Sequence, residues 1–348
     1  MSTLLVDERA EGAPLLRLGF LLPALGALAY PFLLSAISFL LGQAHVAIPP
    51  SPGIIAVAAL AILAVVCAVS AVSIAQALAL GRFEPTNTPG RFLAHLGFAT
   101  PSLLTGFGNI AGLLNARGAL LYAWTAFWLV IMLVATLARD PARPVAAEAP
   151  SRKRLAAAHG VSALLILLLF ILPHLGDHLT GIISGSTHIA VMKAVRGIYR
   201  SEVGEPVLLT LICFQIVSGF LLARRKLERA SDGFGTLQTL TGLYVGIYLL
   251  GHMTAAFSAR GAGTDTNWNW LTDNDHGLLD HLSSFSLVGH YWVGPIAIVA
   301  HVACGLRVVM LEHGVSNVLA SRLASVLIGL GAAASSIILA GLVGVHLA

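Results

Sequence analysis

The sequence predicts an all-α polytopic membrane protein, and three observations lead to this fold class. Of its 348 residues, 57% are hydrophobic and only 10% are charged, and the mean hydropathy is +0.86. Soluble domains have roughly 45 to 50% apolar and about 25% charged residues. Apolar runs of the length that crosses a bilayer as a helix, about 17 to 25 residues, recur along the chain. Lys and Arg residues gather in alternate connections between these runs, as cytoplasmic loops do.

Nine transmembrane helices follow when each apolar run is taken as one span. We expect them near residues 14–42, 53–80, 93–114, 118–138, 157–176, 205–223, 236–259, 285–310 and 320–347. A polar, basic and proline-containing stretch at 141–156 predicts a cytoplasmic linker. This linker would separate a four-helix N-terminal membrane region of unknown role (1–140) from a five-helix C-terminal membrane region (157–348).

The distribution of basic residues predicts the orientation. With nine spans, 15 of the 20 Lys and Arg residues fall on one side, and the other five are Arg117, Lys193, Arg196, Arg200 and Arg260. Because cytoplasmic loops are enriched in Lys and Arg, we expect a cytoplasmic N-terminus and an external C-terminus, in a bacterial inner membrane. The net charge of +4 reflects this bias. The partner it predicts is the lipid bilayer, and no nucleic acid.

Histidines inside the apolar runs of the C-terminal region are the candidate functional residues. His174, His252 and His301 lie in three different spans. An ionisable side chain at bilayer depth is a functional hypothesis by default, because it is costly unless it binds a partner. The alternative interpretation is that each imidazole makes an ordinary hydrogen bond between helices.

Two of these histidines fall at a similar expected depth. A b-type haem takes axial imidazoles from different helices at one level. At 1.5 Å of rise per residue, His174 and His252 differ by roughly 7 Å in depth, so they form a feasible pair. His301 is expected deeper, without an obvious partner, and His290 is a reserve ligand.

A weak internal repeat places a glycine one turn after a polar residue in two spans. Gln215 is followed by Gly219, and His301 is followed by Gly305. A glycine at this position lets a bulky planar group or a neighbouring backbone approach closely. We therefore expect Gly219 and Gly305 to lie against a cofactor.

The segment after the fifth span predicts a short amphipathic helix lying at the outer surface. We expect His178, His188, Tyr199 and Glu205 to handle protons or a quinone there. Two further interpretations stay open: a solvated helix with internal ion pairs, or a metal ion such as zinc on His174 and His178. The candidate clamps for haem propionates in this segment are Arg196 and Arg200.

Two motifs resemble a known family. The segment A-H-V-A-C-G-L-R-V-V-M-L-E-H-G (300–314) looks like a helix of the cytochrome b membrane anchors of succinate dehydrogenase and fumarate reductase, in which an H-x-x-x-G-[IL]-R histidine ligates haem b. The segment L-Q-T-L-T-G-L-Y-V-G-I-Y-L-L-G-H-M (237–253) is similar to the first helix of the di-haem anchors. The resemblance covers roughly 155–348. It implies that His301 and His252 are haem ligands and that Arg307 faces a propionate or a quinone.

The sequence departs from that family at two points. Gln215 stands where such anchors carry a partner histidine, and Leu240-Thr241-Gly242 replaces the H-R-x-[ST]-G quinone motif. The largest extramembrane segment has about 25 residues by our span boundaries, too few for a folded domain. The chain would therefore be at most an electron-transfer subunit that lacks a soluble catalytic domain of its own.

The leading functional hypothesis is an integral membrane b-type haem protein that passes electrons between a quinone pool and redox partner subunits. One alternative is a haem-free structural or lipid-handling membrane protein with the same fold. The other is a proton-coupled transporter, in which the intramembrane histidines form a proton relay.

Overall fold

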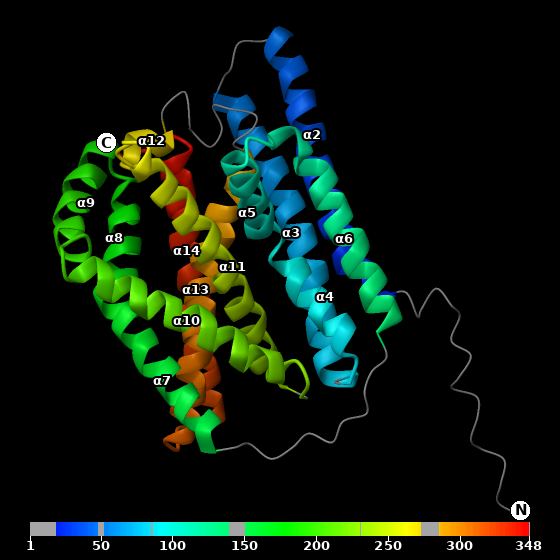
Figure 1. Cartoon of the computed structure of the whole chain (residues 1–348). Coiled ribbons are helices and arrows are strands. Elements are labelled where there is room, and N and C mark those ends of the chain that lie inside the picture. The colour runs from blue at the N-terminus through cyan, green and yellow to red at the C-terminus, as the bar shows by residue number, and fades with distance from the viewer. Residues whose placement is uncertain are drawn as a thin grey trace, which may run out of the picture.

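The computed structural model describes residues 19–47, 52–84, 86–138, 150–229, 231–272 and 285–347, and these residues form an all-α membrane protein (Figure 1). Eight of their helices are long and apolar enough to cross a membrane. The predicted fold class is confirmed. The start of the first expected span and residues 141–149 of the expected linker lie outside the described residues.

The N-terminal region contributes five helices to the bundle. They are α2 (Leu22–Ala47), α3 (Pro52–Phe83), α4 (Thr88–Phe98), α5 (Thr100–Leu113) and α6 (Leu120–Leu137). The C-terminal region begins with α7 (Pro150–Ile166), which continues through a π-helical turn (Leu167–Ile171) into α8 (Leu172–Thr180). The remaining helices are α9 (Gly185–Tyr199), α10 (Gly204–Lys226), α11 (Gly233–Gly261), α12 (Trp268–Thr272), α13 (Phe285–Glu312) and α14 (Asn317–Leu342).

The span expected at 93–114 is a broken helix. It consists of α4 and α5, which meet at Ala99, and Figure 1 draws α4 below α5. Pro101 explains the break, because proline has no N–H to donate to the carbonyl four residues earlier. The Thr100 hydroxyl donates instead to that carbonyl, on Gly97, at 2.6 Å. With this segment counted as one crossing, the described chain has nine.

We name the two ends of the bundle the basic end and the α12 end, after the elements that lie there. The basic end carries the α10–α11 turn (227–232) and the ends of α6 and α13. The α12 end carries α12 and the α8–α9 turn (181–184).

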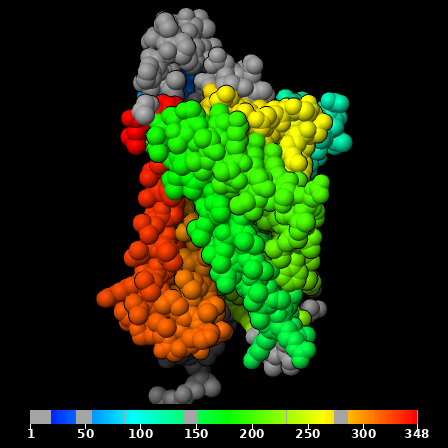
Figure 2. All heavy atoms as spheres, turned by 90° about the vertical axis from the view of Figure 1, so that its left-hand side faces the viewer, coloured from blue at the N-terminus to red at the C-terminus, as the bar shows by residue number. Residues whose placement is uncertain are grey.

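The α9 helix differs from its expected placement across the outer surface. His188, early in α9, contacts His178, and Tyr199, at its end, contacts Phe170 and His174. The helix therefore runs back antiparallel to α8. Its buried side chains, His188 and Met192, explain this packing, because they give α9 an inward face. Figure 2 shows the side of the molecule on which the green residues of α7 to α9 lie next to the orange and red residues of α13 and α14.

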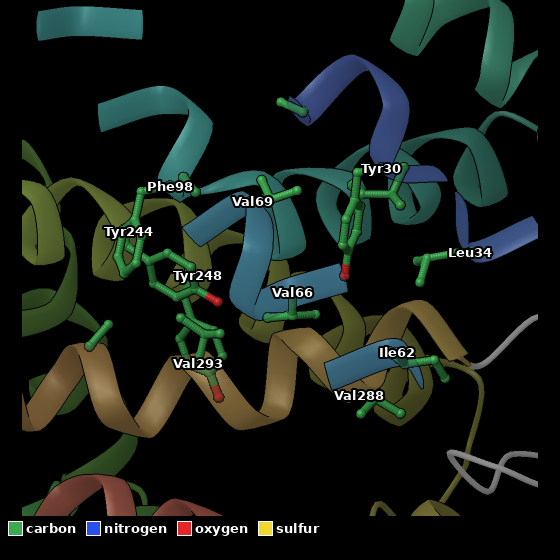
Figure 3. Close-up of a cluster of buried hydrophobic side chains, with 14 of the residues drawn as sticks. Tyr30, Leu34, Ile62, Val66, Val69, Phe98, Tyr244, Tyr248, Val288 and Val293 are labelled. Atoms are coloured by element: carbon green, nitrogen blue, oxygen red, sulfur yellow. The ribbon is translucent and has the colours of Figure 1, made fainter. Parts of the chain in front are cut away.

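One hydrophobic core joins the two regions. Side chains of α2 and α3 meet those of α11 and α13 in this core, which Figure 3 shows. Glycines permit the close approach. A Cβ added to Gly289 of α13 would lie 2.7 Å from the Tyr30 hydroxyl, and one added to Gly294 would lie 2.3 Å from the Tyr248 ring. Small residues at helix contacts are the usual means of tight packing in membranes.

A buried arginine fastens the regions together at the basic end. Arg91 of α4 is 1% exposed, and its guanidinium donates to the Arg229 carbonyl at 2.7 Å and to the Lys226 carbonyl at 3.1 Å. Lys226 is the last residue of α10 and Arg229 lies in the turn that follows it. The C-terminus of a helix leaves its last carbonyls without intrahelical partners and carries partial negative charge. Arg91 supplies both the donors and the compensating charge.

We predict that Arg91→Gln lowers the free energy of unfolding by about 2 to 4 kcal/mol, because two part-buried hydrogen bonds from a charged donor are lost. Thermal unfolding of the purified protein in detergent measures this. The matched control is Arg82→Gln, which alters an exposed arginine at the end of α3. Equal melting temperatures for both variants would contradict the role given to Arg91.

Candidate functional site

Five histidines from four helices form a continuous row in the half of the bundle nearer the α12 end. The row starts in α9, where His188 Nε2 lies 3.3 Å from His178 Nδ1. The His178 and His174 rings, one turn apart in α8, have centres 4.7 Å apart. His174 faces His252 of α11 at 6.3 Å between ring centres, and His252 faces His290 of α13 at 6.3 Å.

Aromatic rings fill the spaces beside this histidine row. Tyr248 stacks on His290 at 4.4 Å and on His252 at 5.4 Å between ring centres. Phe170, in the π-helical turn, stacks on His174 at 4.9 Å. A π-helical turn inserts one extra residue into a helix and is frequent at functional sites. In this chain it lies directly before the histidines of α8.

Several buried polar atoms of the site make no hydrogen bond. They are Nδ1 of His174, Nδ1 of His188 and one carboxylate oxygen of Asp177, which lies 3.6 Å from His188 Nε2. Buried polar groups are nearly always satisfied, and each exception calls for an explanation such as a ligand, an ordered water or a catalytic role. Three exceptions within one cluster make the histidine row the first candidate site.

Burial controls the protonation of His188, which lies outside the membrane-spanning helices. Loss of solvation and, as the smaller cause, the positive charge of Arg196 together lower the pKa of His188 to about 4. The imidazole is therefore neutral at pH 7, and one of its nitrogens can accept a hydrogen bond.

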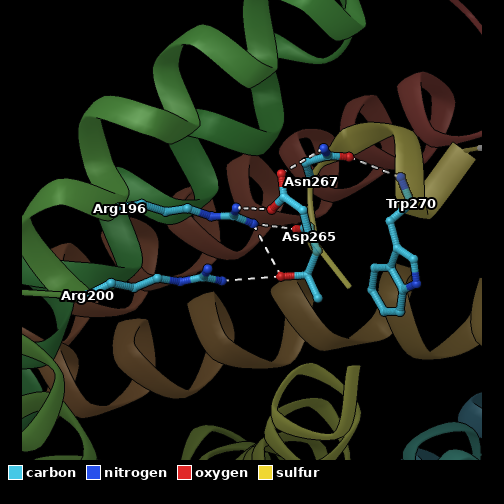
Figure 4. A network of polar contacts seen from close by, with 6 residues as sticks. Arg196, Arg200, Asp265, Asn267 and Trp270 are labelled. Carbon is cyan, nitrogen blue, oxygen red and sulfur yellow. Dashed lines mark hydrogen bonds and ion pairs between the residues drawn. The ribbon is translucent and has the colours of Figure 1, made fainter. Parts of the chain in front are cut away.

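The two arginines expected to hold propionates are engaged by the connection after α11 (Figure 4). Arg196 donates to the Asp265 carboxylate at 2.7 Å and to the Thr266 carbonyl, and Arg200 donates to the Thr266 hydroxyl at 3.2 Å. The hydrogen bond from Arg196 is the main reason that the pKa of Asp265 is lowered. These contacts fix residues 265–267 against α9. They occupy both Nη atoms of Arg196 and one of Arg200, and leave the buried Nε of Arg196 without a partner.

Glu205 and Tyr199, expected to handle protons, lie at the edge of this site. The Glu205 carboxylate forms an ion pair with Arg260, with 2.5 Å between Nη1 and Oε1. Tyr199 places its ring edge on Phe170 at 5.1 Å and near His174 at 6.5 Å. Only Tyr199 of the two touches the histidine row.

A second pair of histidines lies nearer the basic end. His301 of α13 faces His159 of α7 with ring centres 6.3 Å apart and ring planes at 88°. Nδ1 of His301 bonds to the Gln238 carbonyl at 2.9 Å, and Nδ1 of His159 bonds to the Ser218 hydroxyl at 2.8 Å. Both rings are thus oriented through Nδ1, and Nε2 of each is left for another partner.

Glycines make room for these two rings. A Cβ at Gly242 would lie 2.6 Å from His301 Cε1, and one at Gly219 would lie 3.4 Å from His159 Cε1. Gly219 therefore lies against an imidazole. Gly305, the other expected glycine, faces the Gln238 side chain, because a Cβ added there would lie 3.4 Å from the Gln238 Nε2 atom.

Arg307 is not open to a cofactor in this arrangement. Its guanidinium pairs with Asp232 at 3.0 Å and bonds to Ser321 and Asn317 of α14. Its charge also lies over the Phe234 ring, 4.6 Å from the ring centre. The contacts make Arg307 a junction between α11, α13 and α14.

The structure separates His301 from His252, the two ligands that the family resemblance favours. His301 touches Gly242, and His252 lies ten residues further along α11, about 15 Å at 1.5 Å per residue. Each has a different partner, His159 for His301 and His174 for His252. Sequence reasoning missed His159 because it lies only two residues after the expected start of its span at residue 157, whereas α7 begins at Pro150. The available signal was Gly219 of the internal repeat, since a Cβ there would lie 3.4 Å from His159 Cε1.

The residues that the structure describes contain no group of three or more His, Cys, Asp or Glu side chains placed to hold a metal ion. Nothing in this finding favours zinc on His174 and His178. A haem iron takes only two axial ligands from the protein, so a haem site does not require a group of three such side chains. Comparison of the chain with family models, with curated proteins and with solved structures found no match.

We predict that acidification from pH 7 to pH 5 destabilises the protein partly through His188. Its folded pKa of about 4 lies below the ordinary value of 6.5, so the unfolded chain binds more protons in this window. The contribution of His188 to stability is present above pH 6.5 and is lost as the pH falls toward 4. His188→Gln should show a smaller loss of melting temperature between pH 7 and pH 5 than the unmodified protein, whereas the exposed control His313→Gln should match it.

Proposed function

We propose that this integral membrane protein binds b-type haem at two levels and carries electrons across the bilayer. The observation that supports this function is the presence of two facing histidine pairs, His174 with His252 and His159 with His301. Both have 6.3 Å between ring centres. The four ligands come from α7, α8, α11 and α13, which surround the interior of the C-terminal region.

The separation of each pair suits two imidazoles that share one iron. A ring nitrogen binds a transition metal at about 2 Å, so opposed ligands place their nitrogens about 4 Å apart. Each ring centre lies about 1 Å behind its nitrogen, which brings the expected distance between centres to about 6 Å. A pair of histidines that only shared a proton would lie closer, at hydrogen-bond distance.

The surroundings of the basic-end pair suit metal-bound imidazoles. In a ligating histidine, the ring N–H that does not face the metal usually donates a hydrogen bond to a carbonyl, hydroxyl or carboxylate. This bond fixes the tautomer and the ring orientation. His301 has the Gln238 carbonyl in this role and His159 has the Ser218 hydroxyl. In the other pair, the unsatisfied Nδ1 of His174 is a free donor or acceptor for a ligand.

The arrangement of the pairs suits electron transfer through the membrane. Haem would supply one-electron oxidation and reduction when bound. The protein would hold the two sites at different depths, exclude water with apolar helices, and set the redox potentials through the Nδ1 partners. Quinone and redox partner subunits would exchange electrons at the two faces. The resemblance to cytochrome b anchors supports this interpretation for His252 and His301, and the basic-residue bias supports a cytoplasmic basic end in a bacterial inner membrane.

A proton-coupled transporter is a second candidate, favoured by one specific observation. The row runs from His188 through His178, His174 and His252 to His290, and its first step is a nitrogen-to-nitrogen contact of 3.3 Å. Its two steps of 6.3 Å, on either side of His252, would each need a bridging water. Such a row could pass protons between neutral imidazoles. It lies in one half of the bundle, and the second pair at the basic end does not extend it.

The test is the absorption spectrum of the full chain purified from haem-replete cells. A reduced-minus-oxidised spectrum should show Soret and alpha bands, with two haems per chain in the pyridine haemochrome assay. His252→Ala should remove about half of the haem through loss of one axial ligand, His301→Ala should remove the other half, and the double variant should remove both.

The matched control is His313→Ala, in the exposed turn after α13, which should keep the full haem content. A folded, monodisperse preparation without pigment would refute the cytochrome proposal. Proton flux into liposomes that His178→Gln abolishes in such a preparation would favour the transporter instead.

A further inference from the structure

A groove at the basic end lies between the N-terminal and C-terminal regions. It has a volume of about 360 Å³ and is bounded by the start of α4, the end of α6 and the end of α10. This volume is within the range of small-molecule sites, about 300 to 1,000 Å³. The lining residues are Thr88, Pro89, Phe92, Ile131, Val134, Ala135, Ala138, Arg224, Leu227 and Glu228.

The wall of the groove is apolar because of the spacing of residues on α6. Ile131 lies three residues before Val134 and four before Ala135, and Ala138 lies four residues after Val134 and three after Ala135, which are spacings that share a helix face. Val134 is 57% exposed and Phe92, opposite it, is 41% exposed. In a bilayer these side chains face hydrocarbon, so an acyl chain is the natural occupant of the wall.

The rim of the groove carries one charge of each sign. Arg224 and Glu228 are four residues apart at the end of α10, and both are exposed. Neither forms an ion pair with any residue that the structure describes. The rim lies where α4, α6 and α10 reach the basic end, which is the depth of a lipid headgroup if these helices span the bilayer.

We propose that the groove binds one zwitterionic phospholipid whose headgroup carries a primary ammonium. Its phosphate pairs with Arg224, its ammonium pairs with Glu228, and part of an acyl chain lies on Val134, Ala135 and Phe92. A guanidinium recognises a phosphate through charge-assisted hydrogen bonds, and a carboxylate accepts them from an ammonium.

The two rim charges determine the headgroup class. Phosphatidylglycerol, an anionic phospholipid, would satisfy Arg224 through its phosphate, but its glycerol headgroup offers only neutral hydroxyls and no cation to Glu228. A choline headgroup has no N–H to donate to the Glu228 carboxylate. Of these headgroups, only an ammonium-bearing zwitterion completes both contacts with charge-assisted hydrogen bonds. Such a lipid would join α4 and α6 to α10 without haem.

Native mass spectrometry of the full chain, with phosphatidylethanolamine or phosphatidylglycerol added to delipidated protein, tests the proposal. We expect a preference for phosphatidylethanolamine of up to about fivefold, the size expected from one partly exposed ion pair. Arg224→Gln should weaken binding of both lipids. Glu228→Gln should remove the preference, and the matched control Arg225→Gln, which lies outside the groove, should change neither.

Equal binding of the two lipids, or a preference for phosphatidylglycerol, would overturn the headgroup assignment. Unchanged phosphatidylethanolamine binding in Ala135→Phe, which fills the groove, would overturn the site itself. If that variant does not fold, Arg224→Gln and Glu228→Gln decide, because both change exposed side chains. Haem content should stay unchanged in these two variants, so this test is independent of the proposed electron transfer.

Discussion

Close packing of α13 against α3 and α11 is the constraint on which the candidate sites depend. Gly289 and Gly294 allow this approach, because any side chain there would collide with Val66 of α3 or with Tyr248 of α11. The same packing turns His290 and His301 of α13 into the interior, toward α5 and α11. A bulkier residue at either glycine would separate the helices, and both histidine sites would lose one wall.

Much of the fold could be predicted from hydropathy, because a span is a local property of about 20 residues. The break at Ala99 also has a local cause in the sequence, Pro101. The residues around Pro101 are apolar, however, so hydropathy alone indicates one uninterrupted span. The antiparallel course of α9 was not predictable, since its moderate amphipathicity suits a membrane surface as well as a groove between helices. The burial of His188 and Met192 decides the course of α9. These side chains become buried only when α8 and α12 are packed beside α9.

The candidate site was predictable only in part, for a geometric reason. The depth of a residue follows from its position along a span, so His174 and His252 could be matched by counting. The direction in which a side chain points depends on the rotation of its helix, which packing sets. His159 and His301 therefore needed the structure, and so did the contacts that divert Arg196 to Asp265 and Arg307 to Asp232, which join parts of the chain far apart in sequence.

The N-terminal region acts as a cover for the histidine row. Ser102 of α5 bonds to His290 Nδ1 at 3.1 Å, and Asn109 of the same helix bonds to the Gly251 carbonyl at 2.9 Å, next to His252. Without α5, these groups would face lipid, where an unsatisfied polar group costs several kcal/mol. Arg91 holds the opposite end of the same broken span to α10. The break at Ala99 allows both sets of contacts, those of α5 at the histidine row and those of Arg91 at α10. Each half of the broken helix can take its own angle against the C-terminal region.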